Sequence, residues 1–397
     1  MIRRAVALLV AVAVALPLAG CWSRVEVNDL AIVSMMAIDR TEQGQLKVWL
    51  HVVVPAQAGG APGITGGGGG PRGSPFITLS ARGDTVLEAS KLIQLQLPRR
   101  IFWAHMRVIL IGERLGRAGV RRVLDFLTRH REMRLTNYVL MVRGGVTDLM
   151  AAQVDLEKFP VEYLREISRS RIGTVVTVGD FAKALAARGM DPVMGVAEVV
   201  PPSPGAPAPQ RSGLKLNGTA LFRDDKLVGF SDEHTTRGLL WLKGEVHLGV
   251  ITVEIPRAPG HVAVEWVSSR VKRRVRVERG QIVFYIRANT EGDVSENSAN
   301  LDLSDPKALQ AINGQMNREI RERMEEALKQ MQELGTDSAG LGEFLHQRMP
   351  AVWKRVEQKW HRQEFRRVKV VIEVDAHVRR TGLSSKPRGV KEEELVK

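Results

Sequence analysis

Cys21 is the only cysteine in the 397-residue chain, and its thiol has the most distinctive chemistry in the sequence. A single cysteine excludes an intramolecular disulfide and any metal centre that needs several thiolates. Ahead of it, Arg3 and Arg4 form a short positive start, and the twelve residues from Ala5 to Leu16 are all apolar. This length suits the apolar core of an export signal and is too short to span a bilayer.

The residues directly before the cysteine indicate what happens to its thiol. Pro17 ends the apolar segment, and Leu18-Ala19-Gly20-Cys21 has the pattern of a bacterial lipobox. We therefore predict that residues 1–20 are a lipoprotein signal peptide and that Cys21 carries the acyl groups that hold the mature chain on a lipid bilayer. A diacylglyceryl group supplies two chains, which is what stable anchoring requires. No later segment reaches 18 consecutive apolar residues, so the anchor is expected to be lipid rather than a transmembrane helix.

The remaining residues give no pattern that is typical of catalysis. None of the nine histidines has the spacing of a metal-ligand motif, and the chain has no Gly-x-Ser-x-Gly sequence. His51, His105 and His247 lie in segments with a strand pattern, where we expect structural histidines. We predict no catalytic residues, no metal ligands and no cofactor, and hence that the protein is not an enzyme.

Two acidic clusters need a separate interpretation. Asp224 and Asp225 are explained by the tip of a hairpin, because aspartate favours turns. Glu291, Asp293 and Glu296 are predicted to lie in a glycine-containing loop. They do not match the EF-hand series, so a solvated loop is favoured over a cation site.

The chain is basic, with a formal net charge of +14, or +12 once Arg3 and Arg4 leave with the signal peptide. Such a charge favours anionic partners. The densest basic run is 272–276, and we interpret it as an edge strand protected by charge, with a lipid or nucleic-acid contact as the alternative. Aromatic residues make up only 5% of the chain, which disfavours base stacking, and no nucleic-acid partner is predicted.

The first part of the mature chain alternates strand and helix patterns, which is typical of mixed α and β architecture. A glycine-rich stretch at 56–75 is predicted to be a flexible surface loop. It lacks the Gly-Lys-Ser/Thr ending of a phosphate-binding loop. Strands are predicted at 29–39, 45–55, 76–80, 104–112 and 136–143, and helices at 84–97, 113–118, 120–130, 146–153, 161–168 and 180–188.

Proline marks the expected boundary between two regions. Five prolines occur in residues 201–212, and we predict a stiff linker there because proline fixes φ and removes a hydrogen-bond donor. The predicted organisation is an N-terminal region at 21–200, with a subdivision into 21–145 and 146–200 left open, a C-terminal region at 213–382, and a charged tail at 383–397.

The C-terminal region contains the clearest helix. It is predicted to begin after a cap at Ser304, with Asp305-Pro306 in its first turn. A stripe of apolar residues is expected to pack on a sheet, rather than to form a binding groove. The stripe is Leu309, Ile312, Met316, Ile320, Met324, Ala327, Leu328 and Met331. Strands are predicted at 214–222, 226–230, 248–255, 262–277, 281–288 and 365–378, with a short amphipathic segment at 235–243.

We therefore predict a multi-domain α+β fold with mixed sheets and packed helices. Its C-terminal domain would hold an antiparallel-rich sheet covered by a long helix.

Several motifs together resemble one family, the Ger(x)C lipoproteins, which are C subunits of spore germinant receptors. The likeness is collinear over nearly the whole mature chain. Ser23, where an acidic residue is usual, and the glycine-rich tract 59–73 depart from it. The motifs are CWSRVEVNDLA at 21–31, AID at 37–39, FWAH at 102–105, ILIGE at 109–113, LDFLTR at 124–129, REMR at 131–134, LNGTALF at 216–222, KLVG at 226–229, GLLWL at 238–242, and Pro350 with Trp353.

This resemblance implies a non-enzymatic subunit of a germinant receptor, anchored at the outer face of the spore inner membrane. Its expected partners are a membrane-embedded A subunit, a permease-like B subunit and the bilayer itself. A transport-linked solute-binding lipoprotein is the alternative, and it would have two doubly wound lobes around a ligand cleft. A cell-wall hydrolase is disfavoured because the catalytic residues are missing.

Overall fold

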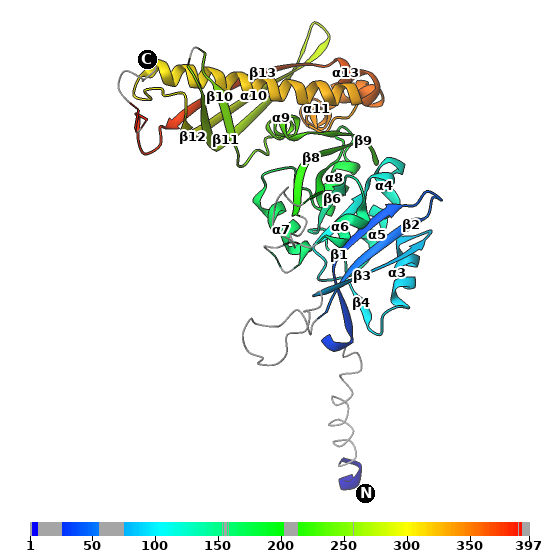
Figure 1. Ribbon diagram of the computed structural model, residues 1–397. Coiled ribbons are helices and arrows are strands. Elements are labelled where there is room, and N and C mark those ends of the chain that lie inside the picture. The colour runs from blue at the N-terminus through cyan, green and yellow to red at the C-terminus, as the bar shows by residue number, and fades with distance from the viewer. Residues whose placement is uncertain are drawn as a thin grey trace.

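The computed structural model has two lobes, each built on its own β-sheet (Figure 1). The residues it describes are 2–6, 26–54, 75–152, 154, 157, 159–201, 213–256, 258–387 and 389–390. Cys21, residues 56–74 of the predicted glycine-rich loop, residues 202–212 of the predicted linker and residues 391–397 lie outside this set. Helices pack on both sheets, so the predicted α+β class is confirmed.

The first lobe contains a nine-stranded sheet in the order β3-β2-β1-β5-β6-β7-β8-β9, with β4 paired to β1. Its centre is parallel, because β1, β5, β6 and β7 run in the same direction. The first two predicted strands are confirmed, and they form an antiparallel hairpin. The strands are β1 (Leu30–Arg40), β2 (Leu46–Val53), β3 (Phe76–Gly83), β4 (Arg100–Phe102), β5 (Val108–Gly112), β6 (Tyr138–Val142), β7 (Val193–Val200), β8 (Gly213–Arg223) and β9 (Lys226–Ser231).

Both faces of this sheet are covered, so alternate residues of one strand enter different cores. Met36 and Ile38 of β1 belong to the apolar core that includes residues of α3 and α5, whereas Met35 and Ala37 belong to a separate core with residues of α6 and α7. Burial on both faces explains why the central strands are continuously apolar. The helices are α3 (Val86–Gln94), α4 (Glu113–Ala118), α5 (Arg121–Arg129), α6 (Val146–Ala151), α7 (Pro160–Ser170) and α8 (Val178–Ala186).

The hairpin formed by β8 and β9 was expected to open the second sheet, and the structure instead adds it to the first. Val200 at the end of β7 pairs with Gly213 at the start of β8 in an antiparallel ladder. The proline-rich segment therefore joins two neighbouring strands of one sheet rather than two lobes. Its composition predicts irregular backbone, which is equally compatible with either kind of connection.

The second lobe contains a four-stranded sheet in the order β10-β11-β12-β13, in which only β12 and β13 are parallel. The long helix α10 (Pro306–Leu334) lies along it (Figure 1). Except for Leu309, which is half-buried, the predicted stripe is buried, and the helix-covered, antiparallel-rich sheet is confirmed. The cap is Asp305 rather than Ser304, because the Asp305 carboxylate accepts from the Lys307 N–H. The strands are β10 (Val250–Glu254), β11 (His261–Glu278), β12 (Gln281–Asn297) and β13 (Lys369–Arg380).

Two parts of the second lobe differ from the prediction. Glu291, Asp293 and Glu296 lie on β12, not in a loop, since β12 continues through Gly292 and pairs there with β11 and β13. The segment before β13 is helical where a strand was expected from residue 365. These helical elements are α11 (Leu341–Arg348), α12 (Pro350–Val356), the short turns Glu357–Lys359 and Trp360–Glu364, and α13 (Phe365–Arg367).

Candidate functional site at the junction of the lobes

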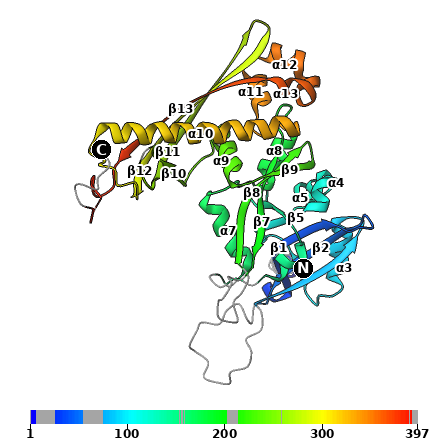
Figure 2. The same cartoon turned by 45° about the horizontal axis from the view of Figure 1, so that its top comes forward.

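Helix α9 (Glu233–Lys243) connects the two lobes by packing between the first sheet and α10 (Figure 2). Its closest approach is at Gly238, where an added Cβ would lie 1.8 Å from the Arg323 carbonyl oxygen of α10. Behind it, three buried hydroxyl groups are linked: Thr219 Oγ1 lies 2.5 Å from Thr174 Oγ1 and 2.9 Å from Thr236 Oγ1. The two helices and β8 therefore form one packed unit.

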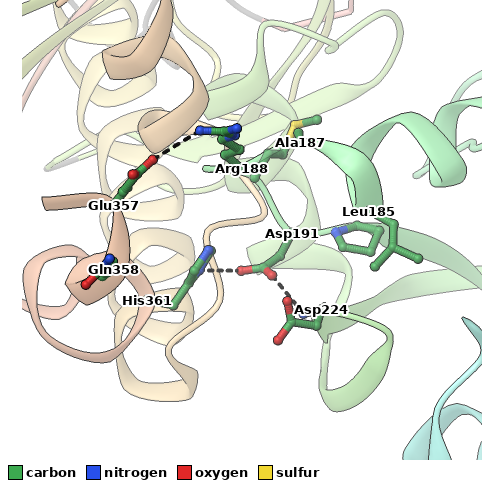
Figure 3. Close-up of a pocket in the computed structure, with 10 residues that line it drawn as sticks. Leu185, Ala187, Arg188, Asp191, Asp224, Glu357, Gln358 and His361 are labelled. Carbon is green, nitrogen blue, oxygen red and sulfur yellow. Dashed lines mark hydrogen bonds and ion pairs between the residues drawn. The ribbon is translucent and has the colours of Figure 1, made fainter. Parts of the chain in front are cut away.

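The polar centre of the junction is Asp191, a buried carboxylate in the segment between α8 and β7. Its Oδ1 accepts from the Asp224 N–H at 2.9 Å, and its Oδ2 accepts from the Asp337 N–H at 2.7 Å. The ring of His361 points at the same carboxylate, with Nδ1 3.0 Å from Oδ2 (Figure 3). One side chain of the first lobe thus contacts two segments of the second.

Asp337 is the second carboxylate of this junction, and it is fully buried in the segment between α10 and α11. Its Oδ1 accepts from the Leu341 N–H at 2.9 Å, and its Oδ2 accepts from the Gly342 N–H at 2.7 Å and from Trp360 Nε1 at 2.9 Å. Burial raises the pKa of Asp337 to about 6, although these three donors favour its charged form.

The backbones of the two lobes approach closely beside these carboxylates. A Cβ added to Gly189 would lie 2.4 Å from the carbonyl carbon of Gly342, so the contact has no room for a side chain. The Glu343 N–H donates to the Gly189 carbonyl at 2.7 Å, and the Asp191 N–H donates to the Asp337 carbonyl at 3.0 Å. The lobes are therefore joined by directional hydrogen bonds as well as by apolar packing.

A cavity of about 350 Å³ opens next to this network (Figure 3). Burial lowers the pKa of His361, but its ion pair with Asp191 and the nearby Asp337 and Asp224 outweigh burial and raise it overall. At the rim, Arg188 and Glu357 form an ion pair of 3.4 Å between the lobes. The lining residues are Leu185, Ala187, Arg188, Met190, Asp191, Pro192, Asp224, Glu357, Gln358 and His361, and none of these side chains is a hydroxyl or thiol nucleophile.

The arrangement is suited to holding the two lobes in register. The His361–Asp191 pair has a histidine and its orienting carboxylate but no nucleophile beside it within the cavity lining. Among the described residues, no group of three or more His, Cys, Asp and Glu side chains is placed to hold a metal ion.

The residues singled out in the sequence are distributed over the molecule and do not converge on this site. Cys21 lies outside the described residues. His51 is the structural histidine that was predicted: it is buried in β2, Nε2 lies 2.7 Å from the Met150 carbonyl oxygen, and burial lowers its pKa to about 4. His105 and His247 lie in a turn and a loop rather than in strands, so that part of the prediction was wrong.

Two other predicted features are partly right. Asp224 and Asp225 do form the β8–β9 turn, and they also bind other elements: Asp225 Oδ2 accepts from the Arg121 N–H at 3.1 Å.

In the basic run, Lys272, Arg274 and Arg276 are exposed on a part of β11 that, among the described strands, pairs only with β12. Arg273 is turned inward and donates to the carbonyls of Leu242 and Ala339.

Sequence reasoning missed Asp191, Asp337 and His361. The segment Gly335-Thr336-Asp337-Ser338-Ala339-Gly340 has the composition of an exposed turn, yet Thr336, Asp337 and Ser338 are buried. The family motifs at 216–222 and at Pro350 with Trp353 lie before and after this segment in the sequence, and they were the only signal that pointed to this region.

Two protein-family models match this chain, one in each half. Residues 23–199 match the family model described as spore germination protein N-terminal domain. Residues 217–382 match the one described as spore germination B3/GerAC like, C-terminal.

Individual relatives show the same relationship. The putative spore germination protein YfkR of Bacillus subtilis is 33% identical over 81% of this chain and 83% of its own length. Spore germination protein KC of the same organism is 26% identical over 93% of this chain and 94% of its own. The crystal structure of the GerBC protein superposes with a TM-score of 0.54 at 19% identity, covering 86% of this chain and 96% of that one. This chain therefore belongs to the GerAC-like family of spore germination proteins.

Proposed function

We propose that the protein is the non-enzymatic C subunit of a nutrient germinant receptor, held by acylated Cys21 on the outer face of the spore inner membrane. The observation that carries this proposal is the match to both family domains, in order, along one chain. In the described residues, no helix has the length and apolarity to cross a membrane. Its proposed partners are the A and B membrane subunits of the same receptor.

The junction supports a role in assembly rather than in chemistry. Its buried carboxylates and the close contact of Gly189 with Gly342 fix one arrangement of the lobes. A fixed arrangement suits a subunit that presents a constant surface to membrane partners. The transport alternative requires two doubly wound lobes, and it is disfavoured because the second sheet is covered along one face by α10 and is mostly antiparallel.

Cys21→Ala tests the anchor. The variant is expected to move from the membrane fraction to the soluble fraction, because the thioether that carries the two acyl chains cannot form. Ser23→Ala is the matched control and should stay with the membrane. A Cys21→Ala protein that still pellets with membranes would contradict the anchoring proposal.

Deletion of the gene tests the receptor role. Spores that lack it should release dipicolinic acid more slowly in response to at least one nutrient, and the full chain supplied in trans should restore the response. Unchanged release over a broad nutrient panel would count against a role in germinant sensing.

A further inference from the structure

The first sheet has one edge, across its strand ends, at which β1 and β4 begin and the antiparallel β2 ends. Leu30, the first residue of β1, pairs in parallel with Arg100, the first residue of β4, and β5 runs in the same direction beside β1. This edge lies at the end of the first lobe that is opposite the second lobe (Figure 1). Only eight residues lie between Cys21 and Leu30, which makes nine steps from one Cα atom to the next. Their Cα atoms are therefore at most about 30 Å apart.

An exposed leucine stands on this edge, in the loop between α3 and β4. Leu95 is 83% exposed, and Pro98, Arg99 and Arg100 are exposed after it. The loop is braced rather than loose: Gln94 Nε2 donates to the Arg99 carbonyl at 2.7 Å, and Gln94 Oε1 accepts from the Ile101 N–H at 2.8 Å. The structure thus holds a large apolar side chain in solvent at a fixed place.

The segment that leads into β6 lies beside this loop and has the same composition. Arg100 forms an ion pair with Glu132 at 3.0 Å, which joins the two segments. After Glu132, Arg134 is exposed and Leu135 is 51% exposed. Within the part of the chain that the structure describes, Arg99, Arg131 and Arg134 have no acidic partner within ion-pair distance.

We propose that this leucine–arginine edge, formed by Leu95, Arg99, Arg100, Arg131, Arg134 and Leu135, rests on the anionic phospholipid surface beside the lipid anchor. The proposal rests on the proposed acylation of Cys21, which places a bilayer within reach of the edge. Exposed leucines enter the boundary between headgroups and acyl chains, and arginines pair with lipid phosphates. Anionic leaflets attract basic residues that lie within a Debye length of them.

The contact would give the tether a direction. An acylated cysteine on a short segment holds the protein at the membrane but does not set its orientation relative to the bilayer. With the edge on the bilayer, the second lobe projects away from the membrane, because it occupies the opposite end of the first lobe (Figure 1).

A fluorophore on a single introduced thiol can report this contact in the full acylated chain. Cys21 is the only natural cysteine and its sulfur is blocked by lipid, so Leu95→Cys gives one labelling site. In vesicles that contain phosphatidylglycerol, an environment-sensitive label at 95 should emit at shorter wavelength and be quenched by spin-labelled lipid. The same label in Leu383→Cys, at a fully exposed position near the C-terminus, should show neither effect.

A charge reversal at Arg99 sharpens the test. Arg99→Glu should reduce the lipid quenching of the label at 95 by about half and weaken its dependence on anionic lipid. Arg274→Glu, an exposed arginine on the β11 hairpin, is the matched control and should leave it unchanged. A label at 95 that stays unquenched while the protein remains on the vesicles would overturn the proposed contact and leave the anchor intact. Shielding that appears only with a membrane protein partner present, without quenching by lipid, would also overturn it and identify a protein interface instead.

Discussion

The helix–sheet contact of the second lobe and the junction between the lobes bury their residues in different ways. Under α10, methionine and isoleucine side chains make an apolar contact with the sheet, and its directional bonds are those of Asn313 and Asn317, which accept the Val378 and Ala376 N–H groups of β13. At the junction, Asp191 and Asp337 accept five backbone or indole N–H groups between them. Apolar packing tolerates small shifts, whereas each hydrogen bond of a buried carboxylate requires one position of its donor. The comparison indicates that the arrangement of the lobes is fixed at the junction.

Asp337→Ala should produce the largest loss of stability, because it leaves the Leu341 and Gly342 N–H groups and Trp360 Nε1 buried without an acceptor. We expect a decrease of about 4 kcal/mol in the free energy of unfolding. Urea denaturation followed by tryptophan fluorescence measures it. Asp305→Ala, at the exposed cap of α10, is the control and should cost about 1 kcal/mol. Equal losses of unfolding free energy for the two variants would show that the hydrogen bonds of the junction contribute no more to stability than an exposed helix cap does.

Met316→Ala tests the apolar contact. Met316 is fully buried between α10 and the sheet, and its truncation leaves a cavity. We expect a loss of about 3 kcal/mol, recovered largely in Met316→Leu, which conserves volume. If Met316→Leu lost as much unfolding free energy as Met316→Ala, the packing under α10 would depend on the exact side-chain shape, as the junction depends on the exact positions of its donors.

The two contacts should also differ in their response to pH. Burial raises the pKa of Asp337 to about 6 in the folded protein, above its usual value of 3.8, so the folded state holds this proton more tightly. The contribution of Asp337 to stability is therefore greatest at low pH and is lost as the pH rises through 6, by about 2 kcal/mol between pH 4 and pH 7. The raised pKa of His361 acts in the same direction, since its stabilising charge is lost as the pH rises.

The comparison of wild type with Asp337→Asn isolates this effect, because the other carboxylates titrate in both proteins. Thermal unfolding measured from pH 4 to pH 7 should show a steeper loss of stability for wild type than for the variant. Parallel curves would contradict the raised pKa.

Arg287→Ala should have the smallest effect. Arg287 and Glu373 form an ion pair of 2.6 Å across β12 and β13, but both side chains are more than half exposed on the uncovered face of the second sheet. Solvent screens such a pair, and we expect a change of no more than about 0.5 kcal/mol in the free energy of unfolding. A larger loss of unfolding free energy would mean that the uncovered face of the second sheet contributes to stability as much as the junction and the packing under α10 do.

The sequence predicted those parts of the molecule in which the apolar pattern is regular or unbroken. The stripe of α10 repeats every three or four residues because only one face of the helix meets the sheet. By contrast, β7 (Val193–Val200) was not predicted: Gly195 and Glu198 interrupt its apolar residues, whereas β5 and β6 were predicted from unbroken apolar runs. The junction was not predicted because Asp191, Asp337 and His361 are brought together only by tertiary folding, and their local sequences are typical of turns.

The β7–β8 ladder has a consequence for how the chain acquires its structure during synthesis. The first sheet cannot be completed until residues 213–231 have left the ribosome, because they supply its last two strands. A nascent or truncated chain that stops near residue 200 would expose the apolar edge of β7 to other chains, and such edges promote aggregation. The boundary between the two family domains thus falls inside the first sheet, and a premature stop there should yield an insoluble product rather than a half-functional one.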